Sequence, residues 1–316
     1  MSALRASGRA RSRSGFLAVV LVMLFAFSAA KCGGVEEPPP PTTTTTTTTV
    51  PLATRLCAGA APTQIGTLQS PDLKELSGLA ASRQYDGVLW AHNDSGDSAR
   101  IFAIDRSGAL RTTVDLDVAK AIDWEDIAAD GTTLYVGDIG DNQRARTEIY
   151  VYRVAEPALT ATSAHADKFT LHYPDGAHDA EALMVDPVDR RLVVVTKEAA
   201  GTSGVYTTPI SAPGALQPVT TLSLGLAQLV TAGDISASGD TIVLRTYTSV
   251  WVWTRAAGES LATALARPPC GAPAPADAQG EALALTPAAD AYVTGSEGAG
   301  SPLWEVAAGS GGPAAP

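Results

Sequence analysis

Acidic residues stand at both ends of a predicted strand in the stretch DWEDIAADGTTLYVGDIGDNQRAR, residues 123–146. The carboxylates nearest the two ends are Asp123, Glu125, Asp126, Asp138 and Asp141. Carboxylates crowded together repel one another, so their pKa values rise or they recruit a cation. Ca²⁺ suits such a set, because it takes about six to eight oxygen ligands from carboxylates, amides and carbonyls. Residues of these types therefore predict a calcium site, or acid–base chemistry, wherever the chain brings them together.

A repeat in the sequence would bring them together. Five segments share one pattern, an apolar strand, a turn rich in Gly, Asp or Pro, a second apolar strand and a polar end. They span residues 76–94, 124–138, 180–198, 232–247 and 280–297. A third strand signal follows each segment, and a fourth follows four of them, the weakest at 261–266. Four strands in about 50 residues is typical of a β-propeller blade.

We therefore predict an all-β fold, a β-propeller of five blades. Six blades are the alternative, if the irregular stretches 155–180 or 212–233 conceal another unit. The fifth unit ends without a fourth strand, and residues 63–69 can supply it by pairing beside 302–307. An N-terminal strand that completes the last blade removes the open edges of a linear array.

The cysteines and the N-terminal region indicate an extracytoplasmic protein. Arginines precede an apolar run, 16–27, that is too short to cross a bilayer comfortably, so residues 1–30 are predicted to be a signal peptide. Residues 31–56, rich in Pro and Thr, are predicted to be a disordered stalk, with the propeller domain at 57–316.

Three modes of release or attachment stay open. Cys32 stands where a lipoprotein carries its lipid, although Lys31 departs from the small residue expected before it. The alternatives are plain secretion and an uncleaved signal anchor, so the protein is secreted or attached to the outer face of the membrane. Cys57 and Cys270 are predicted to form a disulfide that fastens the closing joint, against the alternative of two unrelated thiols.

The blade geometry gathers the acids at one mouth of the channel, because the loop that enters strand one and the loop that leaves strand two lie on the same face. The predicted metal ligands are Asp94, Glu125, Asp138, Asp141, Asn142 and Glu181. The predicted ligand-binding residues are Asn93, Glu198, Tyr247, Glu281 and Glu297. Each acid has an alternative role, since carboxylates in turns and at strand ends often accept hydrogen bonds from backbone N–H groups.

Two cations, Lys197 and Arg245, interrupt the acids. They either form ion pairs or hold an anionic group of a ligand. In a hydrolase, a metal ion would activate water while one of these cations stabilises the anion of a phosphoester, ester or lactone. A carboxylate pair, Asp138 and Glu181, would instead suit glycoside hydrolysis. We accordingly name Asp138, Glu181, Lys197 and Arg245 as candidate catalytic residues. The sequence has no GxSxG, HExxH or P-loop motif, and whether the protein is an enzyme stays open.

The motifs NDSG (93–96), DWEDIA (123–128), DIGDN (138–142), DAEAL (179–183) and GEAL (280–283) resemble those of a family of secreted actinobacterial propeller proteins that are mostly uncharacterised. More distantly, the chain is similar to esterase-like phytase propellers and other NHL-like propellers, and its blade pattern is also WD40-like. This resemblance implies a propeller outside the cytoplasm and a role for the acids. It assigns no catalyst.

Charge narrows the class of partner. The chain carries a formal net charge of −11, and its basic residues are enriched before residue 50. An acidic body repels nucleic acid phosphates, so a nucleic-acid partner is excluded. We predict a monomeric propeller whose acidic mouth binds Ca²⁺ together with a small polar or anionic ligand or a cell-surface partner. The alternative is a metal-assisted hydrolase at the same mouth.

Overall fold

The computed structural model describes residues 50–277, 279–288 and 290–310. The predicted signal peptide, Cys32 and most of the predicted stalk lie outside these residues. The described residues belong to one compact unit, Thr48–Pro316. None of the helices in the described ranges has the length and apolar character needed to cross a membrane.

Short β-strands make up nearly all of the secondary structure, so the predicted all-β class is confirmed. The strands are β1 (Thr63–Thr67), β2 (Leu76–Ala81), β3 (Val88–Asn93), β4 (Arg100–Asp105), β5 (Leu110–Asp117), β6 (Trp124–Asp130), β7 (Thr133–Asp138), β8 (Ile149–Ala155), β9 (Ser163–Leu171), β10 (Ala180–Asp186), β11 (Arg191–Thr196), β12 (Thr202–Pro209), β13 (Gln217–Ser223), β14 (Val230–Ile235), β15 (Thr241–Thr246), β16 (Val250–Thr254), β17 (Cys270–Ala272), β18 (Gly280–Leu285), β19 (Ala291–Ser296) and β20 (Pro302–Ala307). The two helices are α1 (Leu52–Cys57) and α2 (Leu261–Leu265).

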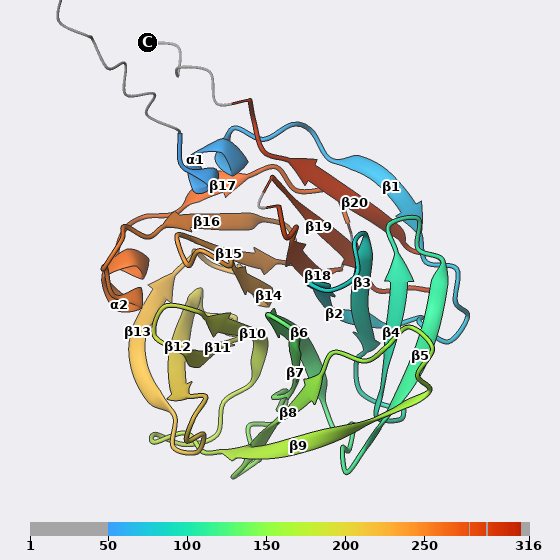
Figure 1. The fold of residues 1–316 in the computed structure, drawn as a ribbon. Coiled ribbons are helices and arrows are strands. Elements are labelled where there is room, and N and C mark those ends of the chain that lie inside the picture. The colour runs from blue at the N-terminus through green and yellow to red at the C-terminus, as the bar shows by residue number, and fades with distance from the viewer. Residues whose placement is uncertain (1–49, 278, 289, 311–316) are drawn as a thin grey trace, which may run out of the picture. The chain divides into compact units, whose positions relative to one another are not determined.

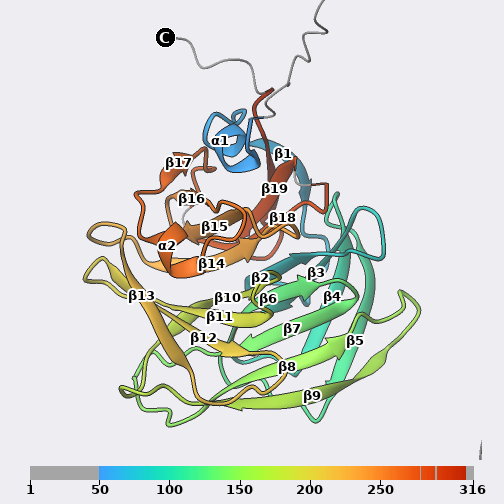
Figure 2. The same cartoon turned by 60° about the vertical axis from the view of Figure 1, so that its left-hand side comes forward.

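The strands form antiparallel groups of four that are arranged around a centre, as in a β-propeller (Figure 1). Three groups are separate sheets, in the orders β10-β11-β12-β13, β14-β15-β16-β17 and β1-β20-β19-β18. The other two, β2 to β5 and β6 to β9, join into one eight-stranded sheet through a short parallel pairing of β5 with β9, and Figure 2 shows these two strands side by side. Strand β1 pairs with β20, which is the pairing that the sequence predicts.

The innermost strand of each group lies nearest the centre. Strand β2 packs beside β6 and β18, β6 also packs beside β10, and β14 packs between β10 and β18. Every residue of β2, β10 and β18 is buried, because these strands have neighbours on both faces. Their sequences, such as LSGLAA and GEALAL, are rich in Gly and Ala, which lets the backbones approach one another closely.

Two predicted segments differ from the structure. Residues 261–266, predicted as a weak fourth strand, contain α2, since Ser260 caps its first turn by accepting the Thr263 N–H. The fourth strand of that group is β17 instead. The end of the predicted disordered stalk contains α1, which buries Ala53 and Leu56 against the apolar core that includes Val243. Burial of these two side chains stabilises a short helix at the end of the segment that the sequence predicted to be disordered.

The predicted disulfide between Cys57 and Cys270 is present, with their Cα atoms 6.0 Å apart. It links the end of α1 to β17, the outer strand of the fourth group. Because α1 leads into β1 of the last group, the bond ties the two neighbouring groups together at their edges. The irregular stretches 155–180 and 212–233, in which the sequence allowed a sixth blade, contain β9 and β13. These are the outer strands of the second and third groups.

Candidate functional site

A cavity of about 170 Å³ lies where the inner strands of the groups meet. All five groups contribute to its wall, through the start of the innermost strand or the end of the next one. It is lined by Ser77, Asp94, Glu125, Asn142, Glu181, Lys197, Tyr247, Glu281 and Glu297. Eight of these nine residues, all but Ser77, are among the predicted site residues, so the sequence identified most of the wall.

A β-bulge aims four of these side chains. Each innermost strand shifts register against its partner near its first residues, and the residues skipped in four of these shifts are Ser77, Glu125, Glu181 and Glu281. A bulge leaves one residue outside the ladder and turns its side chain. The same local irregularity in four of the five groups therefore directs four side chains toward one cavity.

Three carboxylates in this region can hold a metal ion. Asp94, Asp123 and Glu125 each offer an oxygen, and these oxygens lie within 4.8 Å of one another. Gly140 makes the approach possible, because a Cβ at this position would overlap the carboxylates of Glu125 and Asp123. Asn142 adds an amide to the same cavity. Oxygen donors of this kind suit Ca²⁺ or another hard divalent cation.

The pKa values of this trio reflect the cost of holding negative charge there. Burial raises the pKa of Glu125 well above its ordinary value, and repulsion by Glu181, Asp94 and Asp123 raises it further. Burial, with repulsion by Asp94, raises the pKa of Asp123 to about 6. The pKa of Asp94 is raised as well, chiefly by burial. A bound cation would favour the charged forms and reverse these shifts.

An ion pair occupies another part of the wall. The Lys197 ammonium lies 2.5 Å from Glu181 Oε1 and 4.9 Å from the centre of the Tyr247 ring. Burial lowers the pKa of Lys197, but the Glu181 charge outweighs this and raises it. Burial raises the pKa of Glu181 to about 8, and the ammonium opposes that rise. Lys197 is therefore a fixed positive charge that already has a carboxylate partner.

Two glutamates on the remaining wall have no ion-pair partner within the described ranges. Glu281 is 3% exposed, and its Oε2 has no hydrogen-bond partner among the described residues. Burial raises the pKa of Glu281 to about 7. Glu297 accepts a hydrogen bond of 3.1 Å from the Gln279 side chain. This part of the cavity offers acceptors to a ligand.

Two predicted metal ligands, Asp138 and Asp141, do not reach the cavity. Arg146 interacts with both residues. Its guanidinium forms an ion pair with Asp138, at 2.9 Å from Oδ1, and its backbone N–H donates a hydrogen bond of 2.7 Å to Asp141 Oδ2. Asp138 also accepts the backbone N–H of Asp123 at 3.1 Å. Both therefore lie outside the lining of the cavity, and their roles as ligands, and that of Asp138 as a catalytic residue, stay predictions. Asp138 instead positions the segment that carries Asp123.

Three more predicted site residues have local structural partners. Asn93 accepts the backbone N–H groups of Lys74 and Glu75, each at 3.0 Å. Glu198 forms an ion pair with Arg144. Arg245 is fully buried and donates to Asp277 at 3.0 Å, packed against the backbone of Gly280. None of the three lines the cavity, and the buried Nε and Nη1 of Arg245 have no hydrogen-bond partner among the described residues.

Asp123 is the site residue that the predicted set missed. It stands two positions before Glu125 in DWED, a spacing that places alternate side chains on the same side of an extended chain. That spacing was the available signal. Ser77, at the equivalent bulge of β2, donates its hydroxyl to the Glu125 carbonyl at 2.6 Å and so joins the first two groups at the cavity.

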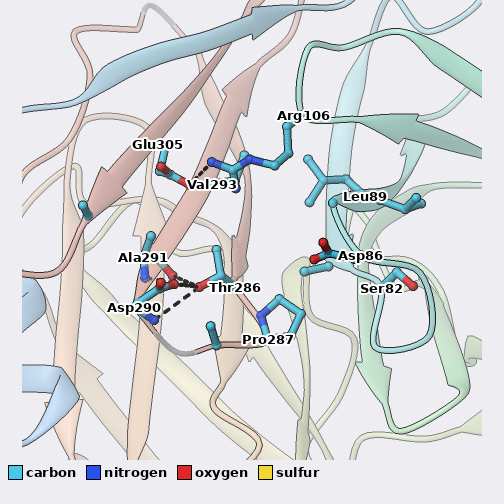
Figure 3. Close-up of a pocket in the computed structure, with 15 residues that line it drawn as sticks. Ser82, Asp86, Leu89, Arg106, Thr286, Pro287, Asp290, Ala291, Val293 and Glu305 are labelled. Carbon is cyan, nitrogen blue, oxygen red and sulfur yellow. Dashed lines mark hydrogen bonds and ion pairs between the residues drawn. The ribbon is translucent and has the colours of Figure 1, made fainter.

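A larger cavity of about 380 Å³ lies between the first and last groups, at the end of the strands away from the acidic cavity (Figure 3). The turn after β2 and the turn after β18 form its sides. Arg106 points across it and pairs with Glu305. No predicted site residue lines it, and its principal charged pair is already satisfied, so the smaller acidic cavity is the better candidate.

The chain matches no protein-family model, and no curated protein is similar to it in sequence. Many solved structures are similar in fold, among them the following three. A gluconolactonase from Xanthomonas campestris gives a TM-score of 0.49 at 11% identity, covering 81% of this chain and 92% of that one. A chain of a nidogen–laminin complex gives 0.43 at 15%, covering 71% and 73%, and the RRP9 WD40 repeats give 0.43 at 11%, covering 79% and 99%. No sequence family is identified for the chain.

Proposed function

We propose that the chain is a five-bladed propeller closed by β1. The pairing of β1 with β20 supports this closure, as does the contact between β18 and β2, the innermost strands of the last and first groups. These contacts join the two ends of the array, and the disulfide adds a link between the fourth and last groups. The proposed closure explains how residues as distant in sequence as Asp94 and Glu281 line one cavity.

The function that the geometry supports best is binding of Ca²⁺ and a small polar ligand in the central cavity. Asp94, Asp123 and Glu125 would hold the cation, with Asn142 beside them. The observation that carries this proposal is the convergence of the three carboxylate oxygens within 4.8 Å. Their pKa values, raised by burial and mutual repulsion, identify a place where a divalent cation would lower the free energy.

Binding of an anionic ligand would require a positive charge from Lys197 or Arg245, the two cations of the predicted site. Lys197 is paired with Glu181, and Arg245 lies outside the cavity beside Asp277. The proposed ligand is therefore polar rather than anionic. A surface partner would reach the same carboxylates only through a group small enough to enter a cavity of about 170 Å³.

Calcium titration of the full chain tests the proposal. After treatment with a chelator, we expect one exothermic or endothermic binding event by calorimetry that weakens at least tenfold in both Glu125→Gln and Asp123→Asn. Glu148→Gln, an exposed carboxylate outside the cavity, is the matched control and should bind as the wild type does. No heat with Ca²⁺, Mg²⁺ or Mn²⁺, or equal binding by all variants, would contradict the metal site.

A metal-assisted hydrolase is the second candidate. It is favoured by the pKa values of Glu181 and Glu281, which burial brings to about 8 and about 7 at the wall of the same cavity. Carboxylates with such values can exchange protons near neutral pH. A panel of chromogenic ester, lactone, phosphoester and glycoside substrates with Ca²⁺ tests it. Turnover that disappears in Glu281→Gln and in Glu125→Gln would replace the binding proposal.

The disulfide is consistent with an extracytoplasmic location, and we propose that the body is exported and held by the N-terminal region. Fractionation of cells that express the full chain tests this. Wild type in the membrane fraction with Cys32→Ser in the medium would support lipid anchoring, whereas both in the medium would support plain secretion.

A further inference from the structure

We propose that the ligand of the central cavity carries a primary ammonium group and that this group binds to Glu281 and Glu297. The inference deepens the proposed function and rests on it in placing a small polar ligand in this cavity. It names the chemical class, an organic amine, and the part of the wall that would recognise it.

The charges that line the cavity favour a cationic ligand. The lining contains the carboxylates of Asp94, Glu125, Glu181, Glu281 and Glu297, and Lys197 is its one basic residue among those described. A divalent cation on the trio would still leave carboxylates in excess, because Lys197 is one positive charge beside Glu181, Glu281 and Glu297. A negatively charged group on a ligand would be repelled by these carboxylates at short range.

The unpaired oxygen of Glu281 indicates a missing hydrogen-bond donor. Its side chain is almost fully buried, yet Oε2 has no partner among the described residues. A buried acceptor without a donor costs about 1–3 kcal/mol. An ammonium group has only donors, and an ammonium beside Glu281 would also favour the charged form of a carboxyl whose pKa burial has raised to about 7.

Lys197 shows how this wall accommodates an ammonium group. Its Nζ lies against the Glu181 carboxylate on one side and the face of the Tyr247 ring on another. Carboxylate together with an aromatic face is favourable for alkylammonium groups. Glu281 and Glu297 make no ion pair with a described residue, so they are the carboxylates of this wall that remain available to a second ammonium.

The volume restricts the amine to a small one. About 170 Å³ corresponds to roughly five or six water molecules, which suits a short aliphatic amine and excludes a long polyamine in full. Putrescine is a suitable probe. Its neutral and anionic counterparts, 1,4-butanediol and succinate, have similar length and test charge alone.

The experiment is calorimetric titration of the full chain with these three probes at pH 8, in chelator and again in excess Ca²⁺. We expect putrescine to bind in both conditions and the diol and succinate to bind at least tenfold more weakly. In Glu281→Gln we expect putrescine affinity to fall at least tenfold while Ca²⁺ affinity changes by less than threefold. Glu148→Gln is the control and should leave both unchanged.

The possible outcomes separate this inference from the metal proposal. Binding of Ca²⁺ without binding of putrescine overturns the amine and leaves the metal site standing. Binding of putrescine that Glu281→Gln leaves intact, or that only Glu125→Gln removes, overturns the assignment to Glu281. If succinate or 1,4-butanediol binds with the same affinity as putrescine, the cavity does not select its ligand by positive charge, and the inference is overturned. Absence of both Ca²⁺ and putrescine binding overturns both proposals.

Discussion

Glu125 and Asp126 are neighbours in the sequence, and both are almost completely buried, yet they differ in what surrounds their carboxylates. Asp126 accepts the backbone N–H groups of Ile127, Leu183 and Gly233, at 2.9, 3.0 and 3.2 Å. It thereby ties β6 to β10 and β14. The Glu125 carboxylate accepts no hydrogen bond from a described residue and faces the cavity beside Asp94 and Asp123.

Burial raises the pKa of both side chains, so the pKa alone does not distinguish a structural acid from a candidate ligand. Their partners do. Asp234 repeats the arrangement of Asp126, because its carboxylate accepts the N–H groups of Ile235 and Leu285 and links β14 to β18. Acids that accept backbone donors stabilise the packing of the innermost strands against one another, whereas acids without such donors remain available to a ligand.

The largest effect on stability is expected from Asp126→Ala. This change leaves the buried N–H groups of Leu183 and Gly233 without their acceptor, and each costs about 1–3 kcal/mol. We expect the free energy of unfolding to fall by about 2–5 kcal/mol, measured by urea denaturation in chelator. A fall below about 1 kcal/mol would mean that Asp126 does not tie the inner strands together.

Asp234→Ala should cost less, since only one of its two hydrogen bonds, to Leu285, reaches another group. We expect the free energy of unfolding to fall by about 1–3 kcal/mol in the same measurement. A loss larger than that of Asp126→Ala would reverse the ranking that the hydrogen bonds predict.

The pH dependence of stability should reveal the acids without donors. The pKa of Glu281 is about 7 in the folded protein, above its ordinary value of 4.5, so the folded state holds this proton more tightly than the unfolded state. Its stabilising contribution is complete below about pH 4.5 and is lost as the pH rises to about 7. The loss is on the order of 1–3 kcal/mol.

Urea denaturation of the chelator-treated protein at several values between pH 4.5 and 8 measures this dependence, and Glu281→Gln is the comparison. The variant should show a flatter decline than the wild type, because it lacks the titrating group. Parallel curves for the two proteins would place the pKa of Glu281 near its ordinary value and would remove the cost of ionisation that a ligand could offset.

The smallest effect on stability is expected from Glu125→Gln. The change removes a repelling charge and no hydrogen bond of the carboxylate with a described residue, so in chelator the free energy of unfolding should rise or stay within about 1 kcal/mol of the wild type. Denaturation alongside Asp126→Ala tests the contrast directly. A destabilisation similar to that of Asp126→Ala would give Glu125 a structural role as well.

The architecture was largely predictable because it repeats. Apolar strands at regular spacing predicted groups of four, and the absence of a fourth strand after 302–307 predicted the pairing of β1. The helix at 261–265 was missed, because the short apolar run LATALA fits a strand or a helix and the capping by Ser260 depends on local geometry. The disulfide was predicted from two cysteines near opposite ends of the predicted propeller domain.

By itself the sequence determined which chemistry is possible, since it places acids near the first residues of β6, β10 and β18 and at or just after the ends of β3, β7 and β19. Only the tertiary structure decided which carboxylates face the cavity without an ion-pair partner. Asp138 and Glu125 are equally acidic in the sequence, but Arg146 pairs with the first, while a bulge turns the second toward Asp94 of another group. Ion pairing and side-chain direction depend on distances between segments remote along the chain, and these distances exist only once the strands have packed.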